Sequence, residues 1–297
     1  MDTSSLALQY LLSGVTKGSI YAVVGIGFNL IYSATGVLNF AQGEFVMLGG
    51  MLAVTLLAFA PLPVAITGAV VVVALLGCLL EVVFFRKLRR HSVLHLIIIT
   101  IGLSIVIQDV ALHVWDERVR SLPYFTGSEI SSLSFLGASV SPQVLWVLGM
   151  VTGIVVLLQG FLKYSRPGRA MRACASNPEA AMLAGINIPT MRMLSFGLSA
   201  GLGALAGCVI SPITMTQYDM GVPLAIKGFA AAILGGMGNP LGAVVGGLSV
   251  GVLESFSVSV LPAAYSDVTA FAVLLLVLFV RPHGLFGKPL GEGVREH

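Results

Sequence analysis

The sequence has very few charged residues. Asp, Glu, Lys and Arg make up 10% of the 297 residues, whereas an ordinary soluble domain carries about 25%. These charges are too few to coat a soluble protein of this length, and they are bunched, so that long apolar stretches lie between them. A helix needs about 20 apolar residues to cross a bilayer, because its backbone polar groups must be satisfied within the segment. The composition therefore excludes a soluble protein and indicates a chain that crosses a membrane many times.

The motifs of enzymes and metal sites are also missing. Cys78, Cys174 and Cys208 are far apart and show no metal-ligand spacing, so we expect neither a disulfide framework nor a bound metal. There is no zinc-binding His-Glu-x-x-His and no Gly-x-Ser-x-Gly nucleophile motif, so we do not expect an enzyme. A P-loop is lacking too, since the single Gly-Lys pair, Gly287-Lys288, is followed by Pro289. We therefore expect no cofactor, and any ATP must be bound by a different subunit.

Twelve of the 16 Lys and Arg residues fall in three regions. They are Arg86, Lys87, Arg89 and Arg90; then Lys163, Arg166, Arg169, Arg172 and Arg192; and finally Arg281, Lys288 and Arg295. Short loops rich in Lys and Arg stay in the cytoplasm, so these regions predict membrane topology rather than nucleic-acid binding. Residues 1–9 lack the basic start of a signal peptide, so we expect the first apolar segment to be retained.

Nine apolar segments can be recognised. They fall at 7–32, 39–60, 63–85, 93–114, 143–164, 190–211, 224–238, 240–261 and 264–280. Nine crossings that start outside place all three basic regions in the cytoplasm, with the C-terminus, and leave the stretch 115–142 outside. The sequence therefore predicts an all-α, polytopic transmembrane helical bundle with about eight to nine membrane segments, some of them broken helices, in a single domain over residues 1–297.

Two of these segments are interrupted. A polar patch at 39–44 lies between the apolar parts of the first two segments. The short segment 224–238 contains Lys227 and ends in Gly235-Gly236-Met237-Gly238-Asn239. Paired breaks in two halves of a membrane protein are typical of a transport pathway. We therefore predict that the pathway is lined by Asn39, Phe40, Gln42, Gly43, Glu44, Lys227, Gly235, Gly236 and Asn239. The simpler interpretation is that these glycines let helices pack closely. Segment 224–238 either crosses with an unwound middle, which fits the basic tail better, or re-enters.

Four carboxylates lie in apolar segments, where such groups are candidates for function. We expect Glu81 and Asp109 to be interfacial, whereas Glu44 or Glu254 could pair with Lys227 in a structural ion pair. The alternative is that Glu44 and Glu254 bind a coupling ion.

The loop at 163–192 predicts a short cytoplasmic helix behind a basic arm. Asn177 suits an N-cap, Pro178 the first helical position, Glu179 the positive end of the helix, and Gly185 a left-handed terminus. Two turns are too few to be stable alone, so we expect a partner to receive them. We predict that the docking residues are Arg166, Gly168, Arg169, Arg172, Glu179, Ala180, Ala181 and Gly185. A solvated connecting helix is the alternative.

At these residues the chain resembles a known family. Glu179-Ala180-Ala181 followed by Gly185 is similar to the cytoplasmic loop by which ABC importer permeases dock on their ATPases. Further matches are Gly14-x-x-x-Gly18-Ser-x-Tyr21-Ala22, Asn39-Phe40-Ala41-x-Gly43-Glu44, Tyr164-Ser165-Arg166-x-Gly168-Arg169, Lys227-x-Phe229-x-Ala231-Ala232-x-Leu234-Gly235-Gly236 and Arg281-Pro282-x-Gly284. Together they resemble the branched-chain amino-acid ABC permease family, and within it the H-type subunit, over nearly the whole chain.

The resemblance implies a permease subunit in a bacterial inner (plasma) membrane, with its N-terminus in the periplasm. Its partners would be a second homologous permease, two cytoplasmic ABC ATPases and a periplasmic substrate-binding protein. The expected substrates are branched-chain or other hydrophobic amino acids, although relatives carry urea, amides or aromatic acids, and the urea type usually has an external domain that is absent here. An ion-coupled transporter acting alone remains the alternative, which would have no use for a docking helix at 177–185.

Overall fold

The computed structural model describes most of the chain between residues 3 and 287. The described residues are 3–86, 93–127, 131, 133–135 and 138–259, with 262, 268, 272, 275–277, 279, 281 and 284–287. The basic residues Lys87, Arg89, Arg90, Lys288 and Arg295 lie outside these residues, as does most of the predicted segment 264–280.

Six helices in the described part are long and apolar enough to cross a membrane. They are α1 (Thr3–Thr35), α3 (Leu62–Leu80, continued by the π-helical turn Glu81–Phe85), α4 (Val93–Trp115), α5 (Pro142–Tyr164), α8 (Ile188–Thr214) and α10 (Pro240–Ser257). Two shorter apolar helices, α2 (Gln42–Leu57) and α9 (Gly221–Gly235), correspond to the two interrupted segments. The prediction of an all-α polytopic bundle is confirmed.

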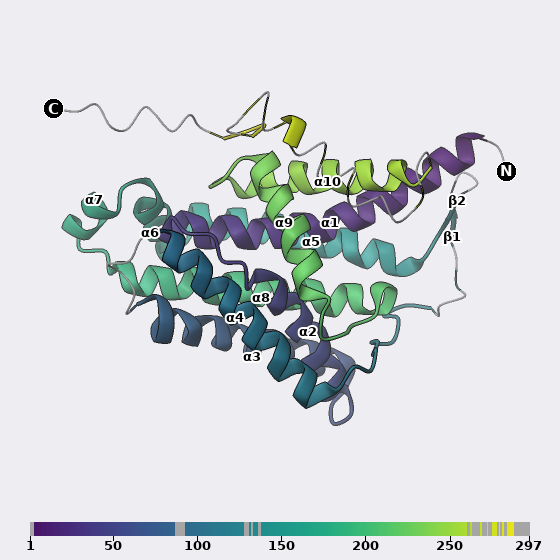
Figure 1. Ribbon diagram of the computed structural model, residues 1–297, viewed down its shortest axis with the longest axis horizontal. Helices are drawn as coiled ribbons and strands as arrows, with labels where there is room; N and C mark the ends of the chain where they lie inside the picture. Colours follow the sequence, from purple (N-terminus) through teal and green to yellow (C-terminus); the bar gives the residue numbers. More distant parts are fainter. Residues whose placement is uncertain are drawn as a thin grey trace.

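Small elements lie at the two ends of this bundle (Figure 1). The helices α6 (Arg166–Ser176) and α7 (Pro178–Leu183) lie together at one end. At the other end, near the start of α1, the strands β1 (Leu133–Phe135) and β2 (Ala138–Val140) form an antiparallel hairpin in which Leu133 pairs with Val140. This hairpin was not predicted.

Five helices begin with the same local signal, a Ser or Asn N-cap followed by proline in the first turn. The caps are Ser141 for α5, Ser165 for α6, Asn177 for α7, Asn187 for α8 and Asn239 for α10, and each side chain accepts a backbone N–H of its helix. The cap satisfies a donor that the helix cannot satisfy itself, and proline fits where no intrahelical N–H bond is needed. These helix starts are therefore encoded locally.

The centre of the bundle is made by α1 and α8. In each, 72% of the most apolar 18-residue window is buried, against 22% in α4 and α5. The bare faces of α4 and α5 carry Ile98, Ile105, Val156 and Leu157, all exposed, as expected of helices that face lipid. The centrally placed helices α1 and α8 therefore support the helices that pack on them, among them α2, α3, α9 and α10.

Glycine lets α1 and α10 approach closely, which the sequence suggested as the simpler role for many glycines. An added Cβ on Gly14, Gly18 or Gly247 would meet the backbone of the opposite helix at once. Membrane helices associate through such close packing rather than through the hydrophobic effect.

The segment predicted at 224–238 differs from expectation. We predicted a crossing that is unwound in its middle, but α9 is an uninterrupted helix of 15 residues. The chain leaves helical geometry on either side of it, at 215–220 and at 236–239. The physical reason is local: Gly236 and Gly238 adopt positive φ values of 102° and 83°, which end α9 and turn the chain into α10.

Candidate functional site

The first predicted pathway segment is tied into the protein by Gln42. Its Nε2 donates to the carbonyl oxygen of Ser199, and its Oε1 accepts from the Ser199 hydroxyl at 2.7 Å. The same hydroxyl lies 2.9 Å from the carbonyl oxygen of Gly27. Gln42 is fully buried, and it fixes the start of α2 against α8 and α1. The neighbouring Gly43 serves close packing, because an added Cβ would collide with the carbonyl of Gly221 on α9.

Asn39 and Phe40 form the bend that leads into α2. The Asn39 Oδ1 accepts the N–H of Ala41 at 3.2 Å, and the Phe40 N–H donates to the hydroxyl of Thr100 on α4. The Phe40 ring is half-buried and lies 5.3 Å from the ring of Phe229 on α9, which in turn lies 5.8 Å from Phe28. The two predicted breaks therefore share an aromatic cluster.

Glu44 is fully buried in the first turn of α2. Its Oε1 accepts a hydrogen bond of 2.8 Å from the Ser104 hydroxyl on α4, whereas its Oε2 has no hydrogen-bond partner. That oxygen lies directly against Gly221, the first residue of α9, where any side chain would collide with it. Glu44 therefore sits where α2, α4 and α9 meet.

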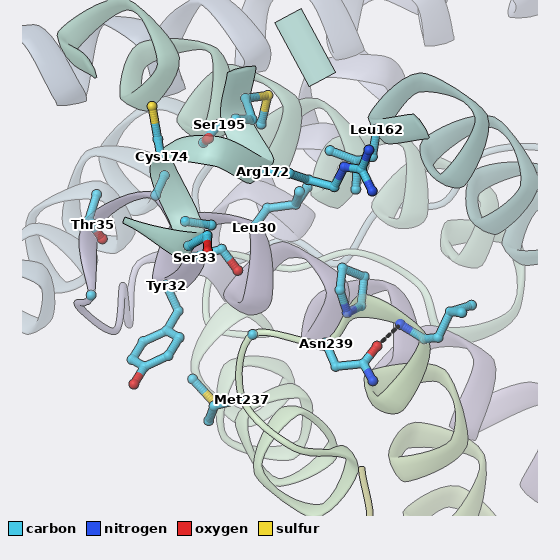
Figure 2. A pocket seen from close by; sticks show the side chains of 18 of the residues that line it. Leu30, Tyr32, Ser33, Thr35, Leu162, Arg172, Cys174, Ser195, Met237 and Asn239 are labelled. Carbon is cyan, nitrogen blue, oxygen red and sulfur yellow. Dashed lines mark hydrogen bonds between the residues drawn. The ribbon is translucent and has the colours of Figure 1, made fainter. Parts of the chain in front are cut away.

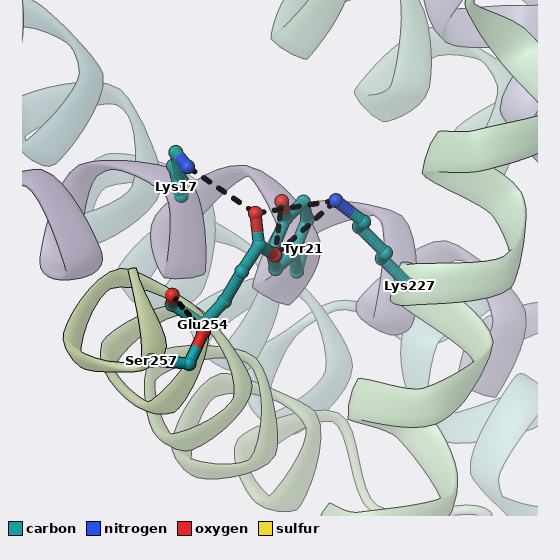
Figure 3. Close-up of polar contacts among 5 residues, drawn as sticks. All are labelled: Lys17, Tyr21, Lys227, Glu254 and Ser257. Carbon is teal, nitrogen blue, oxygen red and sulfur yellow. Dashed lines mark hydrogen bonds and ion pairs between the residues drawn. The ribbon is translucent and has the colours of Figure 1, made fainter. Parts of the chain in front are cut away.

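The predicted ion pair of Lys227 is with Glu254 (Figure 3). Lys227 Nζ and Lys17 Nζ both lie 3.2 Å from the carboxylate of Glu254, and the Tyr21 hydroxyl donates to it at 2.8 Å. Glu254 is buried, so these partners offset the cost of removing its charge from water. Lys17 was not recognised in the sequence as part of this cluster, which joins α1, α9 and α10.

The other two carboxylates, those of Asp109 and Glu81, differ in how exposed they are. Asp109 is exposed, with 66% of its side chain accessible, and lies 3.7 Å from His113. Glu81 is only 1% exposed; that it lies near the membrane interface stays a prediction. It is buried in the turn that continues α3, and the positive charges of Arg192 and Arg86 lie near it.

The second predicted break is a set of tight backbone contacts. An added Cβ on Gly235 would collide with Gly242 of α10, and one on Gly236 would collide with Gly287. Asn239 caps α10 by accepting the N–H groups of Leu241 and Gly242. In the structure these residues pack helices together; that they also line a pathway stays a prediction.

The predicted docking loop folds as α6 followed by α7. Gly168 allows α6 to turn back on α5, because an added Cβ would collide with the carbonyl of Phe161. The side chains of Arg166, Arg169 and Arg172 are exposed. The Asn177 N-cap of α7 accepts the N–H of Ala180 at 3.0 Å, and Gly185 has a φ of 82°. Both features of this helix were predicted from the sequence.

Within α7, the two alanines have different surroundings. Ala180 is exposed, as is Glu179, but Ala181 is 4% exposed and packs with Cys174 and Ile188. The small side chain at 181 is therefore needed by the protein's own packing, not only by a partner. Met182 and Leu183, which were not among the predicted docking residues, are 54% and 88% exposed. The sequence signal that could have identified them is two apolar residues at the end of a six-residue helix, which is too short to bury both.

A groove of 1290 Å³ is lined by one residue of each predicted site, the docking residue Arg172 and the pathway residue Asn239 (Figure 2). Arg172 and Cys174 of α6 line it on one side, Ser33 and Thr35 of α1 on another, and Asn239 where α10 begins. Lys163, Arg172 and Arg192 give the groove positive charge, and no acidic residue lines it within the described part. Burial raises the pKa of the Cys174 thiol.

Comparison with known families gives one match that spans most of the chain. Residues 10–278 match the family described as branched-chain amino acid transport system / permease component.

Among curated proteins, the chain is 35% identical to the high-affinity branched-chain amino acid transport system permease protein LivH of Salmonella typhimurium, over 97% of each chain. It is 35% identical to the corresponding permease protein BraD of Pseudomonas aeruginosa, over 97% of this chain and 98% of that one. A more distant relative, the ribose import permease protein RbsC of Haemophilus influenzae, is 24% identical over 96% of this chain and 88% of its own.

Among solved structures, PsaBC from Streptococcus pneumoniae in complex with Fab is similar, with a TM-score of 0.50 and 13% identity. The match covers 93% of this chain and 92% of that one. At this identity the similarity concerns the fold alone.

Proposed function

Because the chain belongs to the branched-chain amino acid transport permease family, we propose that it imports branched-chain or other hydrophobic amino acids across a membrane. In this proposal it is the permease subunit of an ATP-driven importer and has no enzymatic activity of its own. Its partners are a second homologous permease, two cytoplasmic ABC ATPases and a periplasmic binding protein that delivers the substrate. The membrane is the bacterial inner membrane, with the end that carries α6 and α7 in the cytoplasm.

The observation that carries this proposal is the exposed surface of α7. Met182 and Leu183 project apolar surface from a six-residue helix at the end of the bundle. The helix is held rigidly beneath them, since Asn177 caps its start and Ala181 is buried against Cys174 and Ile188. A rigid helix with bare apolar side chains is what a groove on an ATPase can receive. The exposed Glu179 and Ala180 complete that face.

The groove between α6 and the second break supports a route for the coupling. Arg172 of α6 and Asn239 of α10 line the same groove. When the ATPases close on ATP, α7 would move with them and carry α6, because α6 and α7 share a packed core. The groove would then change width, and the turn between α9 and α10 would follow. Breaks in packed helices are where such rigid-body motions are accommodated.

The substrate class agrees with the surface near both breaks. Phe40 and Phe229 are half-buried aromatic residues that join the bend before α2 to α9. An apolar amino-acid side chain can move along such an aromatic surface while it keeps apolar contacts. The binding protein would perform most of the selection.

Substitutions on α7 test this proposal. Leu183→Asp places a charge on the exposed apolar face, so we expect the ATPases to be lost from the purified complex and uptake to stop. The matched control is Thr190→Asp, which adds the same charge at an exposed residue at the start of α8 and should retain the ATPases. Ala180→Arg should act like Leu183→Asp. A Leu183→Asp complex that keeps its ATPases and its normal uptake rate would contradict the proposal.

A further inference from the structure

Buried polar atoms without a partner gather near the start of α9. Among the described residues, the buried side-chain atoms that lack a hydrogen bond include Glu44 Oε2, Asp219 Oδ1 and Arg120 Nε. Leaving such atoms unsatisfied costs about 1–3 kcal/mol each, and more for charged groups. They are therefore unusual enough to require an explanation.

These three side chains belong to one region. Asp219 lies on the segment that leads into α9, two residues before Gly221, which packs directly against Glu44 Oε2. Arg120 is joined to the same segment, because its backbone exchanges hydrogen bonds of 2.9 and 2.7 Å with Thr216. The segment between α8 and α9 lies on the side of the bundle away from α6 and α7 (Figure 1). The region is closed in this structure, since Glu44 is 0% exposed.

We propose that Glu44, assisted by Asp219, receives the α-ammonium group of the amino-acid substrate on its way through the outer half of the protein. This inference rests on the proposed function and identifies the α-ammonium as the substrate group that the site binds. An ammonium group supplies what Glu44 Oε2 and Asp219 Oδ1 lack, which is N–H donors that carry a positive charge. Arg120 supplies a cation in the same region for the substrate carboxylate.

The surroundings of Glu44 favour an ammonium over other cations. A metal ion prefers several ligands, and no group of three or more His, Cys, Asp or Glu side chains that could hold one occurs in the described part of the chain. Lys227, the protein cation that the sequence offered as a partner, is bound to Glu254. Residue 221 is also suited to this site because it is glycine: an added Cβ there would collide with Glu44 Oε2.

Two substitutions separate charge from shape at Glu44. Glu44→Gln keeps the size of the side chain and can still accept the Ser104 hydrogen bond, but it removes the charge. Glu44→Asp keeps the charge. We would reconstitute the complete transporter in liposomes and measure both uptake of labelled leucine and ATP hydrolysis stimulated by the loaded binding protein. The control is Glu117→Gln, an exposed carboxylate in residues 115–127.

We expect Glu44→Gln to lower leucine uptake about 10- to 100-fold, which corresponds to one charge-assisted hydrogen bond. Glu44→Asp should retain more uptake than Glu44→Gln, Asp219→Asn should show a smaller loss, and Glu117→Gln should be unchanged. Glu44→Gln should still assemble and hydrolyse ATP. If Glu44→Gln transports as well as wild type, or better than Glu44→Asp, transport does not depend on the negative charge of residue 44 and the inference is wrong. If the wild-type complex takes up no amino acid at all, the proposed function itself fails instead.

Discussion

The side chain of Asn29 on α1 is hydrogen-bonded at both ends to the turn that precedes α10. Its Oδ1 accepts the N–H of Gly238 at 2.8 Å, and its Nδ2 donates to the carbonyl oxygen of Asn239 at 3.1 Å. Asn29 is fully buried. One side chain thus holds the turn between α9 and α10, whose Gly236 and Gly238 have positive φ, against the central helix.

Replacing Asn29 by leucine should loosen this turn. Leucine has a similar size but leaves the Gly238 N–H without a partner, whereas the Asn239 carbonyl keeps only its bond from the Ala243 N–H. We therefore expect the free energy of unfolding to fall by about 1–3 kcal/mol. Chemical denaturation of the purified protein in detergent would measure it. Ser33→Ala is the control, because Ser33 lies one turn along α1 and makes no hydrogen bond with the described residues. Equal stability of the two variants would contradict the assignment.

Removing the carboxylate of Glu254 should be far more damaging than removing one of its lysines. Glu254→Gln leaves Lys17 and Lys227 near each other without a counter-charge, which should cost about 3–5 kcal/mol of unfolding free energy. Lys17 is partly exposed, with 42% of its side chain accessible, so Lys17→Gln should cost less than about 1 kcal/mol. The same denaturation experiment measures both. A larger effect at Lys17 would show that the cluster is organised differently.

Gly185 should tolerate asparagine but not valine. Its φ of 82° is a left-handed conformation that a β-branched residue resists, whereas asparagine adopts it with little strain. No other atom lies within 4 Å of an added Cβ, so the backbone alone decides the result. We expect Gly185→Val to lose ATPase binding and Gly185→Asn to retain it, as measured by co-purification. Loss with both variants would instead show that a side chain obstructs the partner.

Cysteine labelling tests the orientation. Ser176 on α6 and Glu117 near the opposite end are both exposed. In intact cells, a membrane-impermeant maleimide should label Glu117→Cys and leave Ser176→Cys unlabelled until the membrane is opened. The native Cys174 should give little background near neutral pH, because it is buried and its raised pKa keeps it in the thiol form; its labelling should increase at higher pH. Labelling of Ser176→Cys from outside would reverse the orientation.

The sequence predicted the elements that depend on local chemistry. The apolar segments, the Asn177 cap and the left-handed Gly185 follow from length and capping. An ion pair of Lys227 follows from its charge in an apolar segment, although the sequence left Glu44 and Glu254 as alternative partners and the structure shows Glu254. The sequence could not predict which face of each helix is buried, because membrane helices are apolar all round. For that reason Lys17 of α1 could not be placed in the ion cluster. The burial of Ala181 could not be predicted either, because it depends on the packing of α7 against Cys174 and Ile188, which lie outside that helix. The packing of Gly235 on Gly242 likewise depends on a helix pair that no local pattern specifies.

The energy source of transport tests the central claim most directly. The complete complex in liposomes should take up leucine only when the loaded binding protein is outside and ATP is available to the ATPases. The chain alone, given a proton or sodium gradient, should take up none. Uptake by the chain alone under such a gradient, unaffected by Leu183→Asp on α7, would show an ion-coupled transporter and contradict the account.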